Sequence, residues 1–196
     1  DWPTVPRHRA RSAIGTNTAS ASHAMTKPSS AGTGMMSRIG PVTAPNRFCQ
    51  VPHCTGVGDR RALALAGMRE VKAEGGWGTV CTEYCSIHPS SDDEPFPSAS
   101  LWDDQDIDRH ALMVEKVHAH GALAGVELWH GGAASPNAYS RETPLGPASM
   151  PAGVYDPVQT RAMDKADIRE FKRWHLEAAR RAQRAGFDIV YVYAAH

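Results

Sequence analysis

A thiol and an imidazole follow each other at the end of a short predicted strand. Residues 48–51 favour an extended chain, and Pro52 ends the hydrogen-bonding ladder because it has no backbone N–H. His53 and Cys54 come directly after it. A thiolate is a nucleophile, so Cys54 could attack an electrophilic cofactor. An unreactive buried cysteine is the simpler interpretation of a single thiol, and the residues alone favour it.

Glu127 is a charged residue inside an apolar segment. Its neighbours in the segment 122–129 are small, aliphatic or aromatic. Burying a carboxylate without a partner costs on the order of several kcal/mol. We therefore expect Glu127 to meet a partner at the end of a strand. That partner is either a bound ligand or an arginine from another segment, and the sequence leaves both open.

Two tyrosines also fall at the ends of predicted strands. Tyr84 lies at the end of the segment 78–85, and Tyr193 closes the segment 187–193. Aromatic side chains at such positions line a pocket or simply pack, and packing is the commoner role. His196 stands three residues after Tyr193, so the two can converge once the strand has ended. They could form an acid–base couple, and a hydrogen bond that only orders the chain is the alternative.

The four cysteines are predicted to be reduced thiols. Cys49, Cys54, Cys81 and Cys85 are too few, and too deep in predicted strands, for a disulfide framework in a domain of this size. Cys81 and Cys85 could be combined with His53 and Cys54 into a zinc site. Their spacing within a strand is not that of a zinc knuckle, so no metal site is predicted.

Alternating strands and helices place these residues. Asp164 and Asp167 form an N-terminal capping pattern for the last helix, and Gly186 ends it. Residues 130–160 are rich in Pro and Gly and are predicted to be a long loop that covers a site. The predicted segments are strands at 48–51, 78–85, 122–129 and 187–193, and helices at 61–74, 107–120 and about 164–185.

Four strands joined by helices imply parallel crossovers and an α/β fold. The sheet is either doubly wound or the first half of a TIM (β/α)8 barrel, and the half-barrel is favoured because no Gly-x-Gly-x-x-Gly motif follows the first strand. Ligands of such folds bind at the carboxyl ends of the strands, where Cys54, Tyr84, Glu127 and Tyr193 are predicted to lie. The chain ends at His196 on a strand end, which would leave open sheet edges and indicates a fragment.

Composition sets limits on location and partners. The 196 residues are 41% hydrophobic and 21% charged, as in a globular protein, and the net charge is zero. No apolar run approaches the roughly 20 residues of a membrane span, and no basic stripe suggests nucleic acid. We expect a cytoplasmic protein. Residues 1–38 are rich in Ala, Ser, Thr, Pro and Gly, and are predicted to be a disordered or spurious extension before an incomplete barrel domain at 39–196.

Five motifs carry a resemblance to a known family. From about residue 40 to its end, the chain resembles the trimethylamine, dimethylamine and histamine dehydrogenase group of the old yellow enzyme family of flavin barrels. The motifs are Gln-Val-Pro-His-Cys at 50–54, Lys-Ala-Glu-Gly-Gly-Trp at 72–77, Thr-Glu-Tyr-Cys-Ser at 82–86, Ala-Leu-Ala-Gly-Val-Glu-Leu-Trp at 122–129 and Gly-Phe-Asp-Ile-Val-Tyr-Val-Tyr-Ala-Ala-His at 186–196.

The resemblance implies an FMN cofactor across the barrel mouth. It places Val51, Pro52 and His53 beside the flavin ring. Cys54 matches the position that carries a covalent bond to the C6 carbon of the flavin. Glu127 matches the position that hydrogen-bonds the pyrimidine edge of the ring, which would be the partner that its burial demands.

The resemblance also implies a substrate and a catalytic pair. Tyr84 matches one wall of an aromatic bowl that holds an ammonium group by cation–π attraction, and dimethylamine-specific relatives carry glutamine there. Tyr193 and His196 match an acid–base pair that an aspartate from further along the chain completes. The implied reaction is oxidative demethylation of a small amine of the trimethylamine kind.

Partners and alternatives follow from the same resemblance. Electrons would pass through a 4Fe-4S cluster to an electron-transferring flavoprotein, and the cluster, an ADP and the second half of the barrel are expected only downstream, in a protein that is a homodimer. His130 replaces a tyrosine of these enzymes. The alternatives are a histamine dehydrogenase, an NADH:flavin ene-reductase or dienoyl-CoA reductase, which usually has histidine at the position of Tyr193, and an inactive half-barrel without flavin.

Overall fold

The computed structural model describes residues 35–92, 98–152 and 158–194. All described residues belong to the unit Thr33–His196. Most of the predicted N-terminal extension, and His196 of the predicted catalytic pair, therefore lie outside the described residues.

A small hairpin opens the described chain. Strand β1 (Ser37–Ile39) pairs antiparallel with β2 (Val42–Ala44), and Gly40 has the positive φ of +56° that the turn requires. Ser37 and Arg38, the last two residues of the predicted extension, belong to β1. The hairpin was not predicted, since three-residue strands are too short to show an alternating pattern.

Parallel strands form the main sheet, as the sequence predicts. Its order is β11 (Ile189–Val192), β6 (Leu123–Trp129), β4 (Thr79–Ser86) and β3 (Cys49–Gln50), with the short β5 (Ala99–Ser100) paired to β4. Every pairing in this sheet is parallel. The first strand is shorter than predicted and comprises only Cys49 and Gln50, although the carbonyl oxygen of Phe48 still accepts from the N–H of Thr79 at 3.1 Å.

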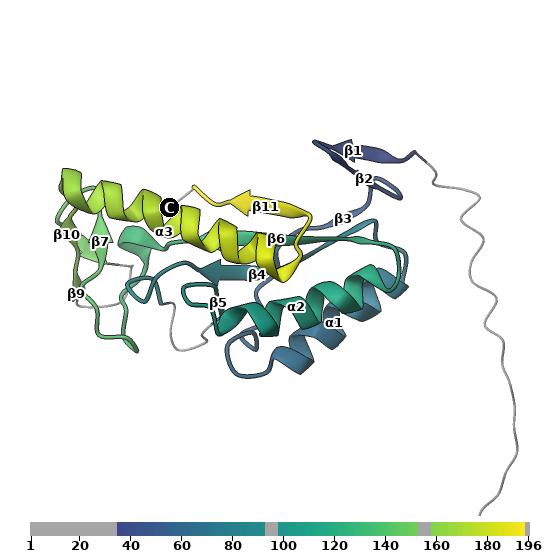
Figure 1. The fold of residues 1–196 in the computed structure, drawn as a ribbon. Helices are drawn as coiled ribbons and strands as arrows, with labels where there is room; N and C mark the ends of the chain where they lie inside the picture. The colour runs from purple at the N-terminus through teal and green to yellow at the C-terminus, as the bar shows by residue number, and fades with distance from the viewer. Residues whose placement is uncertain (1–34, 93–97, 153–157, 195–196) are drawn as a thin grey trace, which may run out of the picture. The chain divides into compact units, whose positions relative to one another are not determined.

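Three helices pack on one face of this sheet (Figure 1). They are α1 (Ala62–Glu74), α2 (Asp106–His118) and α3 (Lys165–Ala185). Alternate residues of β6, such as Val126 and Leu128, belong to the hydrophobic core that the helices complete with Met113, Val117 and Ala182. The predicted half-barrel arrangement, strands inside and helices outside, is thus present.

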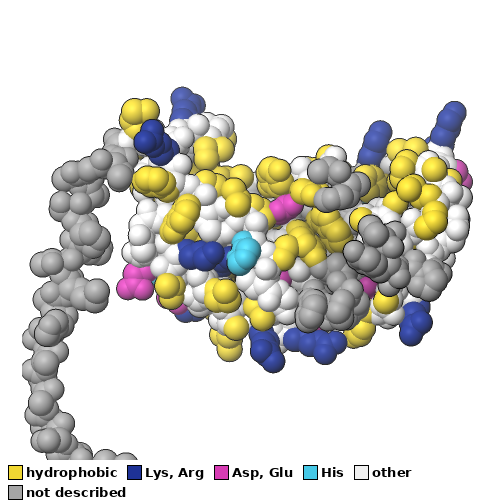
Figure 2. Space-filling model, turned by 180° about the vertical axis from the view of Figure 1, so that it is seen from behind, with side chains coloured by type: hydrophobic (Ala, Val, Ile, Leu, Met, Phe, Trp, Pro, Cys, Tyr) yellow, Lys and Arg dark blue, Asp and Glu magenta, His cyan; other side chains and the backbone are white. Residues whose placement is uncertain are grey.

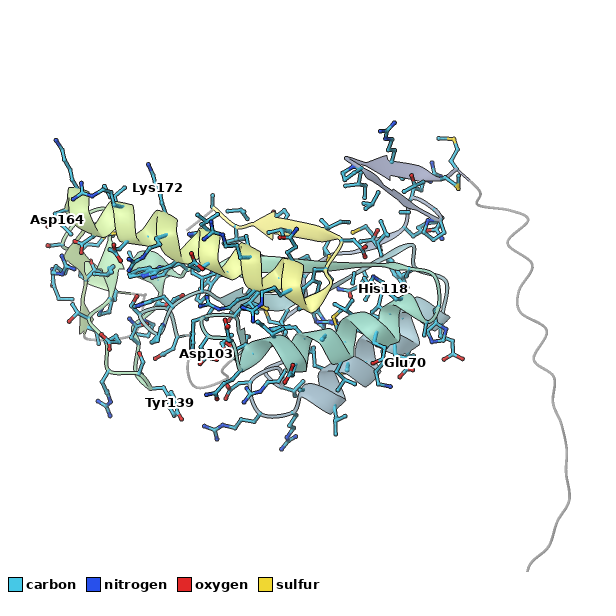
Figure 3. All side chains as sticks on the ribbon, viewed as in Figure 1. Glu70, Asp103, His118, Tyr139, Asp164 and Lys172 are labelled. Atoms are coloured by element: carbon cyan, nitrogen blue, oxygen red, sulfur yellow. The ribbon has the colours of Figure 1, made fainter. Side chains whose placement is uncertain are left out.

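Polar contacts fix the ends of the helices. Asp164 and Asp167 form the predicted capping box of α3, which ends at Gly186 with a φ of +92°. Lys116 of α2 and Glu70 of α1 form an ion pair at 2.5 Å. Figure 3 shows Asp164 at the start of α3 and Glu70 on α1.

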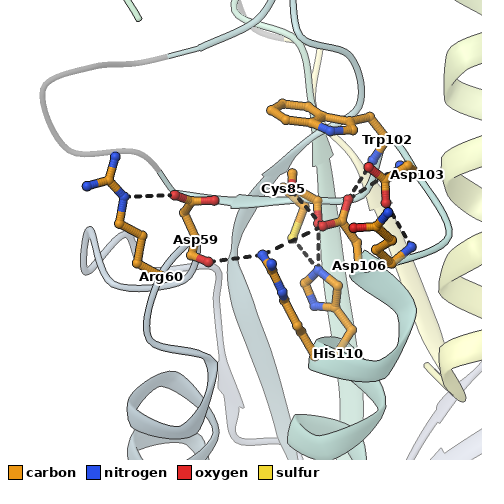
Figure 4. Close-up of polar contacts among 10 residues, drawn as sticks. Asp59, Arg60, Cys85, Trp102, Asp103, Asp106 and His110 are labelled. Carbon is orange, nitrogen blue, oxygen red and sulfur yellow. Dashed lines mark hydrogen bonds and ion pairs between the residues drawn. The ribbon is translucent and has the colours of Figure 1, made fainter. Parts of the chain in front are cut away.

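A buried network ties the start of α2 to β5 (Figure 4). The hydroxyl of Ser100 donates to Asp106 Oδ1 at 2.8 Å, and the N–H of Trp102 donates to Oδ2 at 3.1 Å. Nε2 of His110 donates to the carbonyl oxygen of Ser100 at 2.8 Å. Burial lowers the pKa of His110, so its ring is neutral at pH 7.

The segment 130–160 has no long regular element among its described residues, as predicted. Its short elements, and the strand that follows, are η1 (Gly132–Ala134), β7 (Leu145–Gly146), β8 (Pro151–Ala152), β9 (Val158–Gln159) and β10 (Arg161–Ala162). In the part of the chain that the structure describes, no helix is long and apolar enough to cross a membrane.

Candidate functional site

The register of the sheet brings two predicted site residues, Tyr84 and Glu127, level with a third residue that was not predicted, Tyr191. Glu127 on β6 is paired with Tyr84 on β4 and with Tyr191 on β11. Residues in register share a face of a parallel sheet, and this face is the one opposite the helices, because the flanking residues Val126 and Leu128 point into the helix-side core. Seen from behind, this side of the molecule gathers hydrophobic side chains (Figure 2).

A bulge in β4 decides which residue reaches this face. The register shifts between Cys81, which pairs with Gly125, and Tyr84, which pairs with Glu127. Three residues of β4 therefore span two of β6, and Tyr84 takes the place that Glu83 would occupy in a regular ladder. No sequence pattern predicted this bulge.

Tyr84 packs on a second aromatic ring that was not predicted as a site residue. Its ring centroid lies 4.4 Å from that of Trp129, with an angle of 35° between the ring planes. Trp129 is two residues after Glu127 and so shares its face. The two rings form a continuous aromatic surface at the carboxyl ends of β4 and β6.

Glu127 is buried and lacks a partner among the described residues. Its exposed fraction is 6%, and its carboxylate accepts no hydrogen bond and forms no ion pair with any described side chain. Burial raises the pKa of Glu127. The arginine that was one predicted alternative is not found among these residues, so the carboxylate remains available to a ligand.

The segment that carries Cys54 is exposed at the same edge. Val51, His53 and Cys54 are exposed and Pro52 is partly buried, so all four can meet a ligand. The N–H of His53 donates to the carbonyl oxygen of Thr82 at 3.2 Å, which docks this segment on β4 beyond the end of β3. This placement agrees with the predicted position at the first strand end.

The buried thiols are not alternatives to Cys54 as a nucleophile. Burial raises the pKa of Cys81 to about 12 and also raises the pKa of Cys85, so both stay protonated at neutral pH. Among the described residues no group of three or more His, Cys, Asp or Glu side chains is placed to hold a metal ion.

Tyr193 follows β11 and lines a cavity of about 410 Å³. Its N–H donates to the carbonyl oxygen of Leu128 at 3.0 Å, which continues the pairing with β6. The cavity is shared with His130 and with Phe171 and His175 of α3. Because His196 is not described, the predicted pairing of Tyr193 with His196 remains a prediction.

Two histidines near this cavity are joined through a serine. His88 Nδ1 lies 2.8 Å and His130 Nε2 lies 3.1 Å from the hydroxyl oxygen of Ser90. Nδ1 of His130 accepts from the N–H of Gly132 at 3.1 Å. Burial, and then the neighbouring charges of His88 and His175, lower the pKa of His130 to about 4. This cluster was not predicted, although His130 was recognised as a departure from the family.

A parallel α/β sheet with aromatic and acidic side chains at its carboxyl ends is the site architecture of TIM-barrel enzymes. Residues 37–196 match the NADH:flavin oxidoreductase / NADH oxidase family, and the chain belongs to it. The predicted fold class and family are confirmed. Membership makes the chain part of a flavin oxidoreductase and implies FMN as the cofactor.

Amine-oxidising enzymes are among the similar proteins. Dimethylamine dehydrogenase of Hyphomicrobium sp. (strain x) is 41% identical over 172 residues, which are 81% of this chain and 22% of that protein. The structure of histamine dehydrogenase from Rhizobium sp. 4-9 is 46% identical with a TM-score of 0.81, covering 84% of this chain and 26% of that one. The structure of 6-hydroxypseudooxynicotine amine oxidase from Pseudomonas geniculata N1 is 47% identical with a TM-score of 0.81, covering 84% of this chain and 25% of that one.

The chain therefore spans about a quarter of the length of these relatives. Its own residues fit a flavin. The partnerless carboxylate of Glu127 suits the N–H of the flavin pyrimidine, and the buried Oε1 of Gln50 also lacks a partner among the described residues. Cys54 is exposed at the same edge of the sheet.

Proposed function

We propose that the protein is an FMN-dependent amine dehydrogenase that oxidises a small amine. The observation that carries the proposal is the carboxylate of Glu127, which belongs to a residue 6% exposed, has no partner among the described residues and lies level with the Tyr84 ring. A buried acceptor without a donor is costly unless a ligand supplies the donor. The similarity to dimethylamine and histamine dehydrogenases supports an amine as the substrate.

Five residues would hold the cofactor. Val51, Pro52 and His53 would lie beside the flavin ring, and Glu127 would accept a hydrogen bond from its pyrimidine edge. Cys54 would hold the ring covalently through its sulfur at C6.

Tyr84 and Trp129 would form walls of the substrate site. A methylated ammonium against an aromatic face gains ~0.5–2 kcal/mol. Because Tyr84 stands where dimethylamine-specific relatives carry glutamine, a trimethylamine-like substrate or histamine fits better than dimethylamine. Tyr193, with His196, would hold and move a proton beside the substrate nitrogen or carbon.

When bound, FMN supplies the acceptor for two electrons from the substrate C–N unit, and water then hydrolyses the imine to a smaller amine and an aldehyde. The electrons would leave one at a time through a 4Fe-4S cluster to an electron-transferring flavoprotein. The cluster, an ADP site and a homodimer interface would belong to parts of the relatives that this chain does not span.

Anaerobic reduction of the flavin tests the proposal directly. The purified full-length protein should lose its visible flavin absorbance when trimethylamine or histamine is added, and lose it more slowly with dimethylamine. Bleaching by NADH or NADPH but by none of the amines would contradict the proposal and support an ene-reductase. A protein that carries no flavin would support the inactive half-barrel.

Acid precipitation tests the covalent bond separately. Yellow colour should stay with the precipitated protein, and Cys54→Ala should release it to the supernatant, whereas Cys49→Ala, which also removes an exposed thiol, should not. Complete release from the unmodified protein would exclude the covalent bond but not FMN binding.

The acid–base role of Tyr193 has its own test. Tyr193→Phe should slow flavin reduction by amine and remove one ionisation from the pH profile of that step. An unchanged profile would leave Tyr193 as a packing residue of the cavity that it lines.

A further inference from the structure

Two buried side chains of opposite charge hold the backbone on either side of Cys54. Arg69 of α1 and Glu83 of β4 both have 0% of their surface exposed. Nη2 of Arg69 donates to the carbonyl oxygen of His53 at 2.6 Å. Oε1 of Glu83 accepts from the N–H of Thr55 at 3.3 Å and from the hydroxyl of the same residue. The residue before Cys54 is thus held by a cation and the residue after it by an anion.

The same loop is fixed at further points. The N–H of His53 donates to Thr82, so both backbone polar groups of His53 are engaged. At the far end a Cβ on the buried Gly58 would lie 2.8 Å from Cβ of Ala99 and 3.0 Å from Oε2 of Glu83. The loop backbone therefore packs directly on β5 and on Glu83, while Cys54 stays exposed.

Neither charge is fully satisfied. Nε and Nη1 of Arg69 and Oε2 of Glu83 are buried and have no hydrogen-bond partner among the described residues. The two side chains interact as charges without forming an ion pair within 4.0 Å in this part of the chain. Burying a guanidinium with two unmatched N–H groups costs stability. The single hydrogen bond to the carbonyl oxygen of His53 does not offset this cost, so the burial of Arg69 needs a further explanation.

The positive charge of Arg69 acts on several ionisable groups around it, and these differ in exposure. Burial keeps Cys81 and Cys85 protonated at neutral pH, because it raises the pKa of each thiol. Cys54 is exposed, and so is its neighbour His53. Arg69 interacts electrostatically with four groups, Glu83, Cys81, Cys54 and Cys85. Cys54 is the one thiol of these three that is exposed.

We propose that Arg69 and Glu83 are positioning residues for Cys54. They fix the loop on both sides of the thiol and set, with opposite signs, the fraction of it that is thiolate. A nearby cation favours the thiolate and a nearby anion disfavours it, so the pair tunes the nucleophile as well as placing it. The use of this thiolate to bind flavin rests on the proposed function, whereas the effect on the thiol itself does not.

Alkylation of the flavin-free protein tests this pair. The full-length protein is prepared from riboflavin-starved cells, treated with iodoacetamide at pH 7, and the rate at each cysteine is followed by mass spectrometry. Arg69→Gln should slow the reaction of Cys54 about 3- to 10-fold, and Glu83→Gln should speed it about 2- to 5-fold, as expected for removal of a nearby charge of each sign. Cys49 is the exposed reference and should keep its rate.

The buried cysteines report whether a variant is folded. Cys81 and Cys85 should stay protected in both variants. If Arg69→Gln exposes these two cysteines, that variant is misfolded and the proposal is tested with Arg69→Lys and Glu83→Gln instead. The lysine keeps the positive charge, so Cys54 in Arg69→Lys should react within about twofold of the original rate. Cys54 in Glu83→Gln should still react faster than in the original protein.

Two results would overturn the proposal. One is a change of the Cys54 rate in the same direction in Arg69→Gln and Glu83→Gln, because a merely loosened loop acts alike in both. The other is an unchanged rate in Glu83→Gln. Failure of the proposed function, seen as absent flavin or no reduction by amines, leaves these rates as they are, so the two failures are distinguishable.

Discussion

Two buried acidic residues, one at the start of a helix and one on a strand, have opposite surroundings. Asp106, at the start of α2, is 5% exposed and accepts hydrogen bonds from Ser100 and Trp102 (Figure 4). Glu127, on the other face of the sheet, is 6% exposed and accepts none from the described residues. Equal burial thus hides a difference in function. A satisfied acid stabilises the fold, whereas an acid without a partner needs another explanation, which for Glu127 we propose is the flavin.

The same contrast separates the two faces of the sheet. On the helix side, polar groups such as Asp106 and His110 find partners within the chain. On the opposite side, the carboxylate of Glu127 has no partner in the described part of the chain. Arg69 and Glu83 also keep buried polar atoms without a partner among the described residues, and these are the two side chains that we assign to Cys54.

Removal of the satisfied acid should have the largest effect on stability. Asp106→Ala leaves the Ser100 hydroxyl and the Trp102 N–H without their acceptor, so the free energy of unfolding should fall by about 3 kcal/mol. Urea denaturation measures this, with the exposed Asp108→Ala in the same helical turn as a control that should change by less than about 0.5 kcal/mol. The flavin affinity of the folded Asp106→Ala protein should not change. A loss of affinity would contradict the purely structural role of Asp106.

Removal of the unsatisfied acid should have the opposite pattern. Glu127→Gln abolishes a buried charge, so the flavin-free protein should gain about 1 kcal/mol of stability at pH 7. Burial raises the pKa of Glu127 above its ordinary 4.5. Its favourable contribution is therefore complete below that pH and is lost as the pH rises through the folded-state pKa, and the variant should remove this loss.

The same Glu127→Gln variant should bind the cofactor more weakly. FMN affinity, measured by fluorescence titration, should fall about tenfold, which corresponds to about 1.4 kcal/mol for one charge-assisted hydrogen bond. Glu115→Gln, on the exposed side of α2, is the matched control and should change neither quantity. A destabilised Glu127→Gln protein would mean that the carboxylate is satisfied after all.

Much of this contrast could be predicted from the sequence. The helix ends at Gly186 and at Asp164, and the strand that carries Glu127, follow from local signals that act over a few residues. The bulge of β4 and the complete burial of Arg69 do not, because both depend on contacts between segments far apart in the chain. An arginine at a helical position is normally exposed, so no sequence pattern marks Arg69 as a core residue.

Tyr84→Gln should have a smaller, selective effect. It removes one aromatic face beside Trp129, so the apparent affinity for trimethylamine should fall about 3- to 10-fold and that for dimethylamine less. Flavin reduction at several concentrations of each amine measures both. Tyr139→Gln, on an exposed loop, is the control. Equal losses for both amines would place Tyr84 with the structural side of the comparison.

His130 combines features of a structural residue and of a site residue, and its substitution should have the smallest effect on stability. It is buried and has partners, as a structural residue does, yet it also lines the cavity beside Tyr193. Nδ1 accepts from the Gly132 N–H, so Nε2 carries the proton and donates to Ser90, and the ring is held in its neutral form.

That neutral form makes stability depend on pH in a defined direction. The pKa of His130 is lowered from 6.5 to about 4, so its contribution is present above pH 6.5 and is lost as the pH falls toward 4. Between pH 7 and pH 6 the loss for one such group is about 0.7 kcal/mol. His130→Gln should flatten the pH dependence of the urea midpoint by that amount, while the exposed His120→Gln should not. Because burial also lowers the pKa of His88 and His110, some dependence should persist in the variant, and its full disappearance would show that these three rings titrate as one unit.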